Sequence, residues 1–213
     1  VGGNLQDHLQ LRMVFKVQGV KTLNVMASNI VGKMQIGLQY ALFQSGPMSM
    51  APSQLGAFAK SDPLQATPNL QYHVQPLSLD KFGEPLHAFP AFTASVCNLR
   101  PTSRGHVHIA SADSYAAPKI VPNYLSTEQD RKVAADALRL TRAIAAAPAL
   151  KKFVPQEYKP GAQFQSEEEL AQAASQIGTT IFHPVGTCRM GVAGDASSVV
   201  DSQLRVLGVA GLR

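Results

Sequence analysis

Cysteine is scarce in this sequence, since only Cys97 and Cys188 occur among 213 residues. The two residues lie far apart and form neither a Cys-x-x-Cys pair nor the dense pattern of a disulfide scaffold. We therefore expect two reduced thiols, and no metal site with the usual zinc spacing.

Long apolar runs are also missing, and none approaches the roughly 20 residues that a membrane-spanning helix needs. The first residues, VGGNLQDHLQLRM, lack the basic segment and apolar stretch of a secretory signal. These absences favour a cytoplasmic protein, provided that the natural N-terminus also lacks a signal. Because the chain begins in what reads as mid-motif and stops inside an apolar, strand-like run, we expect a fragment of a longer protein.

Charged residues make up only 15% of the chain, and the formal net charge is +5. The lysines and arginines are scattered singly, without the basic stripe that is typical of a nucleic-acid partner. The sequence has no Gly-x-Gly-x-x-Gly between a strand and a helix, which indicates that a nucleotide-binding domain is absent. It also has no Gly-x-Ser-x-Gly elbow, which argues against a hydrolase with a Ser-His arrangement.

Period-two apolar spacing predicts a strand over residues 9–17, with Leu11, Met13 and Phe15 on one face. Short apolar runs between turn residues predict further strands near 54–59, 69–75, 91–99 and 106–110. The turn-rich segment 100–105 separates the last two runs, so we expect a hairpin there.

Three helices are expected. Ser28 is the expected cap of the first, in which apolar residues recur every four positions from Ile30 to Leu42 before Gly46-Pro47. A capping-box pattern of Ser126 and Gln129 opens the second helix, over 126–147. A second capping-box pattern, of Ser166 and Glu169, opens a shorter third helix, which Gly178 is expected to close in the left-handed conformation. The face of the long helix is expected at Val133, Ala137, Leu140 and Ile144, and that of the short one at Leu170, Ala173, Ala174 and Ile177. Strands and helices without regular alternation predict an α+β fold, a mostly antiparallel sheet flanked by helices.

The segment TTIFHPVGTCRMG, residues 179–191, combines glycine, proline, threonine and a titratable ring. Pro184 biases the backbone of His183 to extended geometry, so its side chain leaves the preceding strand in a defined direction. A neutral imidazole can accept a proton at physiological pH, as a general base must. The alternative is a structural histidine that holds the turn through a backbone carbonyl.

Four segments, in this order, resemble the glucose–methanol–choline (GMC) oxidoreductases. They are VGGNLQDH at residues 1–8, LRPTSRG at 99–105, PKIVPNYLS at 118–126, and HPVGTCRMG at 183–191 followed by VVDSQLRVLGVAGLR at 199–213. In this family FAD takes a hydride from an alcohol while a base removes the hydroxyl proton. The resemblance implies that His183 is that base or its close partner, and that the second catalytic residue lies beyond Arg213.

The resemblance also implies a domain division. Residues 1–8 would link to an FAD-binding portion that precedes this chain, 9–198 would form the substrate-binding domain, and 199–213 would return to the FAD domain. FAD would then be bound mainly outside this chain, and the fragment alone is expected to be inactive.

Two residues are expected to face the substrate. His73 lies where choline-oxidising members carry a substrate-facing histidine, although the alternation around it fits a solvent-facing residue equally well; Tyr72 is expected in the core on the opposite face. Gln10 stands where those members carry a carboxylate that can pair with a quaternary ammonium. The missing charge favours a neutral alcohol over choline.

The remaining histidines and polar residues have simpler interpretations. Asn4 and Asp7 are expected to fix backbone turns, and His106 and His108 to form a solvated strand face. The alternative to an alcohol oxidoreductase is a non-catalytic binding or interaction module that retains the substrate-domain fold.

Overall fold

The computed structural model describes residues 1–51, 53–81, 83–192 and 194–213. These residues form two compact units. The sheet unit comprises Gln10–Leu99 and Arg131–Thr179, and the loop unit comprises Val1–Leu9, Arg100–Asp130 and Thr180–Arg213. Residues 1–8 are expected to link to the FAD-binding portion, and residues 199–213 to return to it. Because that portion lies outside this chain, both roles stay predictions.

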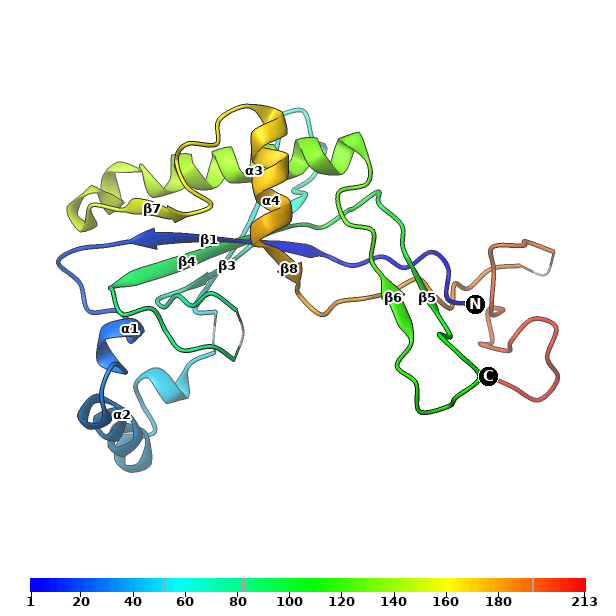
Figure 1. The fold of residues 1–213 in the computed structure, drawn as a ribbon, viewed down its shortest axis with the longest axis horizontal. Helices are drawn as coiled ribbons and strands as arrows, with labels where there is room; N and C mark the ends of the chain where they lie inside the picture. Colours follow the sequence, from blue (N-terminus) through cyan, green and yellow to red (C-terminus); the bar gives the residue numbers. More distant parts are fainter. Residues whose placement is uncertain (52, 82, 193) are drawn as a thin grey trace. The chain divides into compact units, whose positions relative to one another are not determined.

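The sheet unit is built on a six-stranded sheet (Figure 1). Its strands are β1 (Leu9–Lys16), β2 (Leu55–Ala59), β3 (Leu70–Gln75), β4 (Ala91–Asn98), β7 (Gln156–Lys159) and β8 (Gly178–Thr180). The order is β2-β3-β4-β1-β7, with β8 paired to β1 outside this path. The pairs along β2-β3-β4-β1-β7 are antiparallel, which confirms the α+β class with a mostly antiparallel sheet.

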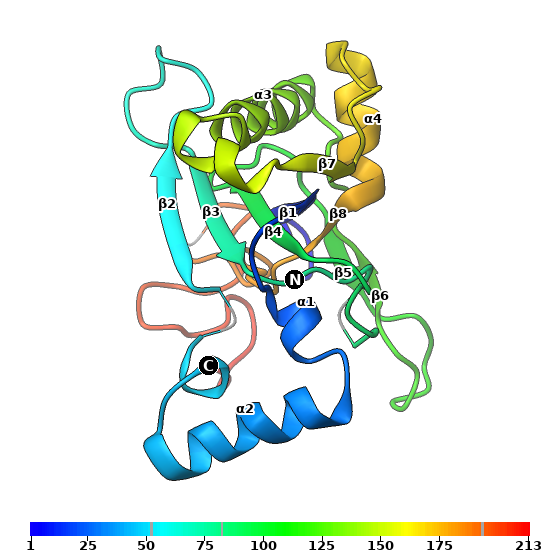
Figure 2. The ribbon, with the colours of Figure 1, turned by 90° about the vertical axis from the view of Figure 1, so that its left-hand side faces the viewer.

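The helices are α1 (Leu23–Met26), α2 (Ile30–Phe43), α3 (Glu128–Ala145) and α4 (Glu167–Ile177), with 3-10 turns η1 (Pro47–Ser49) and η2 (Pro148–Phe153). Figure 2 shows α3 lying across one face of strands β2, β3, β4 and β1. The loop unit contains a two-stranded sheet of β5 (His106–His108) and β6 (Lys119–Val121).

The predicted alternation of β1 is confirmed. Leu11, Met13 and Phe15 share one face, and each is at most 3% exposed. The register places Leu11 beside Val96 of β4, and Val96 beside Tyr72 of β3. This apolar face contacts α3, because the Tyr72 hydroxyl lies 3.0 Å from the hydroxyl of Thr141. Each large apolar side chain buried here contributes about 1.5–3 kcal/mol.

The hairpin predicted across residues 100–105 is wrong. β4 pairs with β1 and β3, whereas β5 pairs with β6 in a separate sheet. The segment is held instead by the carboxylate of Asp130, which accepts the backbone N–H groups of Thr102 at 2.9 Å and Ser103 at 2.8 Å. Burial raises the pKa of the Asp130 carboxyl, but hydrogen bonds from Ser103 and Thr102 outweigh it and hold that pKa below its ordinary value.

Helix α2 is confirmed, but its predicted cap is wrong. The side chain of Asn29, not of Ser28, accepts the N–H of Gly32 at 2.9 Å, because Asn29 directly precedes the first helical residue. Ser28 donates its hydroxyl to the carbonyl of Val25. The helix ends at Gln44, whose φ of 49° is left-handed.

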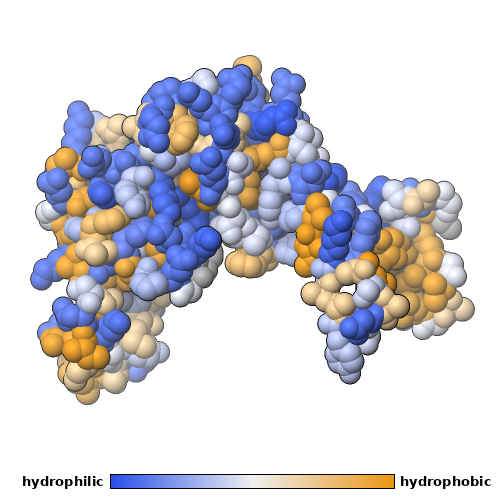
Figure 3. Space-filling view, in the orientation of Figure 1, coloured by the Kyte–Doolittle hydropathy of each residue, from blue (hydrophilic) through white to orange (hydrophobic). Residues whose placement is uncertain are grey.

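The apolar spacing of α2 marks an exposed face. Met34, Leu38 and Leu42 are 67%, 60% and 64% exposed, and no residue of α2 is buried. Figure 3 shows the resulting orange surface over this helix. The spacing therefore predicted the helix but not its environment.

Helix α3 begins at Glu128, so the predicted cap at Ser126 is also wrong. The hydroxyl of Thr127 accepts the N–H of Asp130 at 3.2 Å, as a capping residue does. Of the expected face, Val133 and Ala137 are buried, whereas Ile144 is 46% exposed. The buried stripe is rotated toward the neighbouring positions. It comprises Val133, Ala134, Ala135, Ala137, Leu138, Thr141 and Ala145.

The capping box of α4 is confirmed. The Ser166 hydroxyl accepts the N–H of Glu169 at 3.2 Å, and the Glu169 carboxylate accepts the N–H of Ser166 at 3.0 Å. The prediction for Gly178 is wrong, since its φ of −76° and ψ of 141° are extended. The chain passes from α4 directly into β8, so no left-handed turn is needed.

Removal of this box should loosen α4 locally. We expect Ser166→Ala to cost about 1 kcal/mol, because a helix N–H loses its partner. Amide exchange over residues 167–177 should then become about fivefold faster, measured by mass spectrometry. Ser175→Ala is the matched control, since its exposed hydroxyl donates only to the carbonyl of Gln172 on the same helix. Equal acceleration in both variants would contradict a capping role.

Candidate active site around His183

The loop that carries His183 is tied to the buried carboxylate of Asp7, which is 8% exposed. Asp7 accepts hydrogen bonds from the hydroxyls of Tyr124 and Thr180, each at 2.5 Å, and from the backbone N–H of His183 at 3.1 Å. Thr180, the last residue of β8, also accepts the N–H of Phe182 at 2.8 Å. The backbone of His183 is therefore fixed while its side chain stays available.

Tyr124 acts as a donor in this cluster. Burial raises the pKa of its phenol to about 12, and the hydrogen bond to Asp7 acts in the same direction. The phenol consequently keeps its proton across the physiological range. It can stabilise the carboxylate of Asp7 but cannot serve as a base there.

A second set of contacts holds the loop beyond Pro184. Gln6 and Val185 exchange backbone hydrogen bonds of 2.9 and 2.8 Å, and the amide of Asn4 donates to the carbonyl of Gly186 at 3.2 Å. A Cβ on Gly186 would lie 2.4 Å from the carbonyl oxygen of Asn4, and its φ of 95° also requires glycine. Asn4 and Asp7 thus hold backbone groups as expected, but these groups belong to a loop that is distant in sequence and are not local amides.

The side chain of His183 is exposed. Its ring centroid lies 5.7 Å from that of His8, with the ring planes at 70°. Nδ1 of His8 is buried and has no hydrogen-bond partner among the described residues. The site thus presents one accessible imidazole on a rigid loop, beside a second imidazole whose nitrogen can still accept or donate one hydrogen bond.

Gln10 and His73 belong to the sheet unit, whereas His183 belongs to the loop unit. Gln10 of β1 is opposite Cys97 of β4, and His73 of β3 is opposite Ser95 of β4. Because these positions alternate with Leu11 and Tyr72, Gln10 and His73 share the face of the sheet that is directed away from α3. Tyr72 is 3% exposed on the other face, as expected.

His106 and His108 form no part of the cluster around His183. Their rings stack at 4.3 Å on β5, where His108 is exposed and His106 is partly exposed. This arrangement agrees with the expected strand face in contact with solvent.

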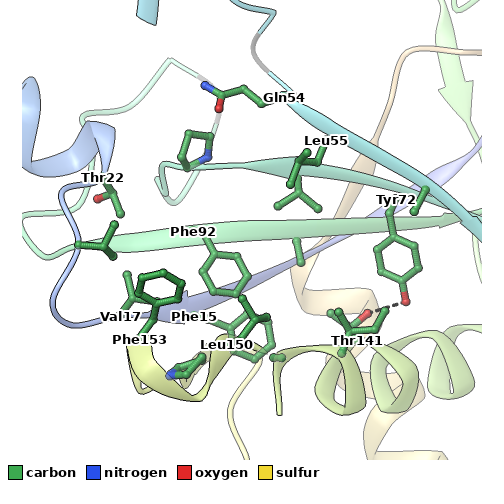
Figure 4. Close-up of a pocket in the computed structure, with 18 of the residues that line it drawn as sticks. Phe15, Val17, Thr22, Gln54, Leu55, Tyr72, Phe92, Thr141, Leu150 and Phe153 are labelled. Carbon is green, nitrogen blue, oxygen red and sulfur yellow. Dashed lines mark hydrogen bonds between the residues drawn. The ribbon is translucent and has the colours of Figure 1, made fainter. Parts of the chain in front are cut away.

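A cavity of about 420 Å³ lies on the apolar side of the sheet. Figure 4 shows Phe15, Phe92 and Phe153 around this space, with the hydrogen-bonded pair Tyr72 and Thr141 at one end. Thr141 donates its hydroxyl to the carbonyl of Ala137, so both hydroxyls are already engaged. The cavity can enclose an apolar group, but neither Gln10 nor His73 lines it.

Several side chains of interest escaped prediction from the sequence. The roles of Tyr124 and Thr180 in the cluster depend on contacts with Asp7 across 117 and 173 positions of the chain. The sequence indicates His8 only as part of the linking segment 1–8, and not as a neighbour of His183. Arg12 had a visible signal, because it is a charged residue between Leu11 and Met13 of β1, and it is 6% exposed.

Comparison with known proteins decides the family. A model of the GMC oxidoreductase family matches residues 101–213, more than half of the chain. The chain belongs to the GMC oxidoreductase family. The matched region of this GMC chain contains Tyr124, Thr180 and His183.

The curated relatives match the GMC chain over its whole length. It is 35% identical to oxygen-dependent choline dehydrogenase 1 of Chromohalobacter salexigens and 36% identical to alcohol dehydrogenase [acceptor] of Pseudomonas putida. In each case it spans 38% of the relative's length. An Aspergillus oryzae formate oxidase shares the fold with a TM-score of 0.86 at 23% identity, covering 100% of this chain and 42% of that one.

The described residues of the GMC chain contain neither a membrane-spanning helix nor a cluster of metal ligands. Among the described residues, no helix is both long and apolar enough to cross a bilayer. Within the same ranges, no group of three or more His, Cys, Asp or Glu side chains is arranged to hold a metal ion.

Proposed function

We propose that this chain is the substrate-binding part of an FAD-dependent alcohol dehydrogenase or oxidase, in which His183 accepts the proton of the alcohol's hydroxyl group. The observation that carries the proposal is the exposed imidazole of His183 on a loop whose backbone is bound to Asp7. Exposure allows the ring to reach a substrate. The fixed backbone lowers the entropy cost of orienting the base.

FAD, when bound, supplies the acceptor for the hydride that leaves the alcohol carbon. The described residues fit such a group, since the imidazole of His183 is exposed and Nδ1 of His8 lacks a protein partner. The sequence has no dinucleotide-binding glycine motif. We therefore place most of the FAD contacts outside this chain, with residues 1–8 linking to that portion, 9–198 binding substrate and 199–213 returning to it.

In this proposal the residues around His183 have different roles. His183 takes the hydroxyl proton on one ring nitrogen, and Asp7 holds the loop through the backbone rather than by touching the ring. Tyr124 and Thr180 donate to Asp7 and so keep it in place. A positioned base of this kind accelerates proton transfer by about 10²–10⁴-fold.

The substrate we propose is an alcohol without a positive charge, such as a neutral primary alcohol. Gln10 is 5% exposed and uncharged, so it cannot pair with a quaternary ammonium as a carboxylate can. His73 lies on the same sheet face and is the second proposed contact. The resemblance to an alcohol dehydrogenase therefore guides this proposal more than the resemblance to a choline dehydrogenase does.

Anaerobic mixing of the complete flavoprotein with a panel of alcohols tests the function directly. We expect a neutral primary alcohol to bleach the flavin, with kcat/KM about tenfold or more above that of choline, because no carboxylate at Gln10 attracts the cation. Choline turnover that matches the best neutral alcohol would contradict the substrate assignment. Absence of bleaching by every alcohol would instead favour a non-catalytic binding module.

A further inference from the structure

The cavity of about 420 Å³ on the apolar side of the sheet is too large to be a packing defect. Protein interiors are close-packed, and voids larger than a water molecule are few. The volume lies instead within the range of about 300–1,000 Å³ that is typical of small-molecule sites. The described residues that line the cavity all belong to the sheet unit, so the space is enclosed by one compact unit.

The wall of this cavity suits a hydrocarbon group. The rings of Phe15 and Phe92, which are paired across β1 and β4, stack with their centroids 5.2 Å apart. Phe153 of η2 faces the same space (Figure 4). An apolar cavity gives a water molecule no hydrogen-bond partners, so it can stay dry until an apolar group enters it.

The cavity is open to solvent beside the edge strand β2. Leu55 of β2, Ile144 near the end of α3, and Val20 line the cavity and are 66%, 46% and 39% exposed. Contiguous apolar surface of this kind marks a site of interaction. A ligand can therefore enter from solvent and bury these side chains.

One charged group lies among these apolar residues. Of the described residues that line the cavity, Lys21 alone carries a charge at neutral pH. Its side chain is exposed and forms no ion pair with another described residue. A lysine can rest its stem on an apolar surface while the ammonium stays in water. The charge at the cavity therefore complements an anion that stays near solvent.

We propose that this cavity binds an unbranched monocarboxylate, with its hydrocarbon chain against the phenylalanine rings and its carboxylate beside Lys21. The site goes beyond the proposed function. The cavity lies on the face of the sheet that contacts α3, whereas Gln10 and His73 are on the opposite face, so its ligand is not the reacting alcohol.

Calorimetry with the complete flavoprotein tests the proposal, with hexanoate, octanoate and decanoate as the probes. Because each added methylene is taken out of water, we expect the affinity to rise about tenfold from hexanoate to octanoate. Decanoate should bind at least as tightly as octanoate. An affinity that does not change with chain length would overturn burial of the hydrocarbon chain.

Two tryptophan variants of β2 locate the site. Ala57 is exposed and lines the cavity, so the indole of Ala57→Trp would occupy the space and lower the affinity for decanoate about tenfold or more, equivalent to two excluded methylenes. Phe58→Trp is the matched control, because the next residue of a strand points to the opposite face. Its affinity should stay within about twofold of wild type.

Melting temperatures of the free variants identify any protein that fails to fold. If Ala57→Trp does so, Leu55→Trp repeats the test from a second exposed position of the cavity wall. Equal affinities of a filled variant and Phe58→Trp would overturn the location. Decanoate that does not bind to wild type, as expected if another part of the complete protein filled the cavity, would overturn the proposal altogether.

A third comparison tests the carboxylate. Lys21→Met should weaken the binding of decanoate about threefold to fivefold, the scale for one exposed ion pair, and leave the binding of uncharged decanamide within about twofold. Lys33→Met, which removes an exposed lysine of the same unit outside the cavity lining, should leave both affinities unchanged. Wild type that binds decanamide as tightly as decanoate would overturn the assignment of an anionic ligand.

Discussion

Replacement of His183 by alanine in the complete flavoprotein should slow anaerobic flavin reduction by about a hundredfold or more, the scale for a lost general base. The physical reason is that the hydroxyl proton then has no positioned acceptor when the hydride leaves. Folding should be little affected, because the His183 side chain is exposed and Asp7 binds its backbone N–H rather than its ring. Stopped-flow absorbance at saturating alcohol measures the rate.

His108→Ala is the matched control, because His108 is also an exposed histidine of the loop unit. Its flavin reduction should stay within about twofold of wild type, as expected for a surface substitution. If His183→Ala reduced the flavin as fast as His108→Ala does, His183 would be a structural residue of the loop.

The second large effect is expected at Asp7, a positioning residue. Asp7→Ala leaves the hydroxyls of Tyr124 and Thr180 and the N–H of His183 without their common acceptor. We expect a loss of about 3 kcal/mol in unfolding free energy, because buried donors lose a charged partner. Flavin reduction should also slow by about tenfold or more, since small displacements of a catalytic group are costly.

Two variants calibrate the Asp7 result. Thr180→Val removes one of the three donors to Asp7 and the acceptor of the Phe182 N–H, but leaves the bond from Asp7 to the backbone of His183, so the stability loss should be about 1–2 kcal/mol. Asp113→Ala removes an exposed carboxylate of the same unit that accepts only local backbone N–H groups such as that of Tyr115, and should be close to neutral. Flavin reduction at saturating alcohol, scaled to flavin content, separates misplacement of His183 from loss of folded protein. An unchanged scaled rate in Asp7→Ala would contradict the positioning role.

The elements that the sequence predicts well are those whose signal is local. β1 follows from alternation over eight residues, and α4 follows from the reciprocal bonds of Ser166 and Glu169. The shorter strands β6 and β8, with three residues each, and β7, with four, are too brief for a periodic signal. They form because partners distant in sequence supply their hydrogen bonds.

The wrong predictions also arise where contacts with residues distant in sequence, and not local signals, determine the structure. A hairpin was the local interpretation of residues 100–105, but the carboxylate of Asp130, supplied from α3, fixes Thr102 and Ser103 in a loop. The caps of α2 and α3 were displaced by one residue, which is the usual uncertainty of a helix boundary. The exposure of α2 could not be predicted, since apolar spacing identifies a face but not its environment.

Prediction of the candidate site from the sequence is also limited to features that local residues or the family resemblance indicate. His183 could be proposed from the composition of its loop and from the family resemblance, and Gln10 and His73 from the resemblance alone. The cluster that holds His183 could not, because Asp7 meets Tyr124 and Thr180 only after folding.

Rescue of flavin reduction in His183→Ala by added imidazole tests the central claim most directly, because a free base can replace the lost acceptor of the hydroxyl proton. Flavin reduction by a neutral alcohol should become faster with rising imidazole concentration in His183→Ala and should stay unchanged in wild type. A rate in His183→Ala that does not respond to imidazole would show that another group takes the proton.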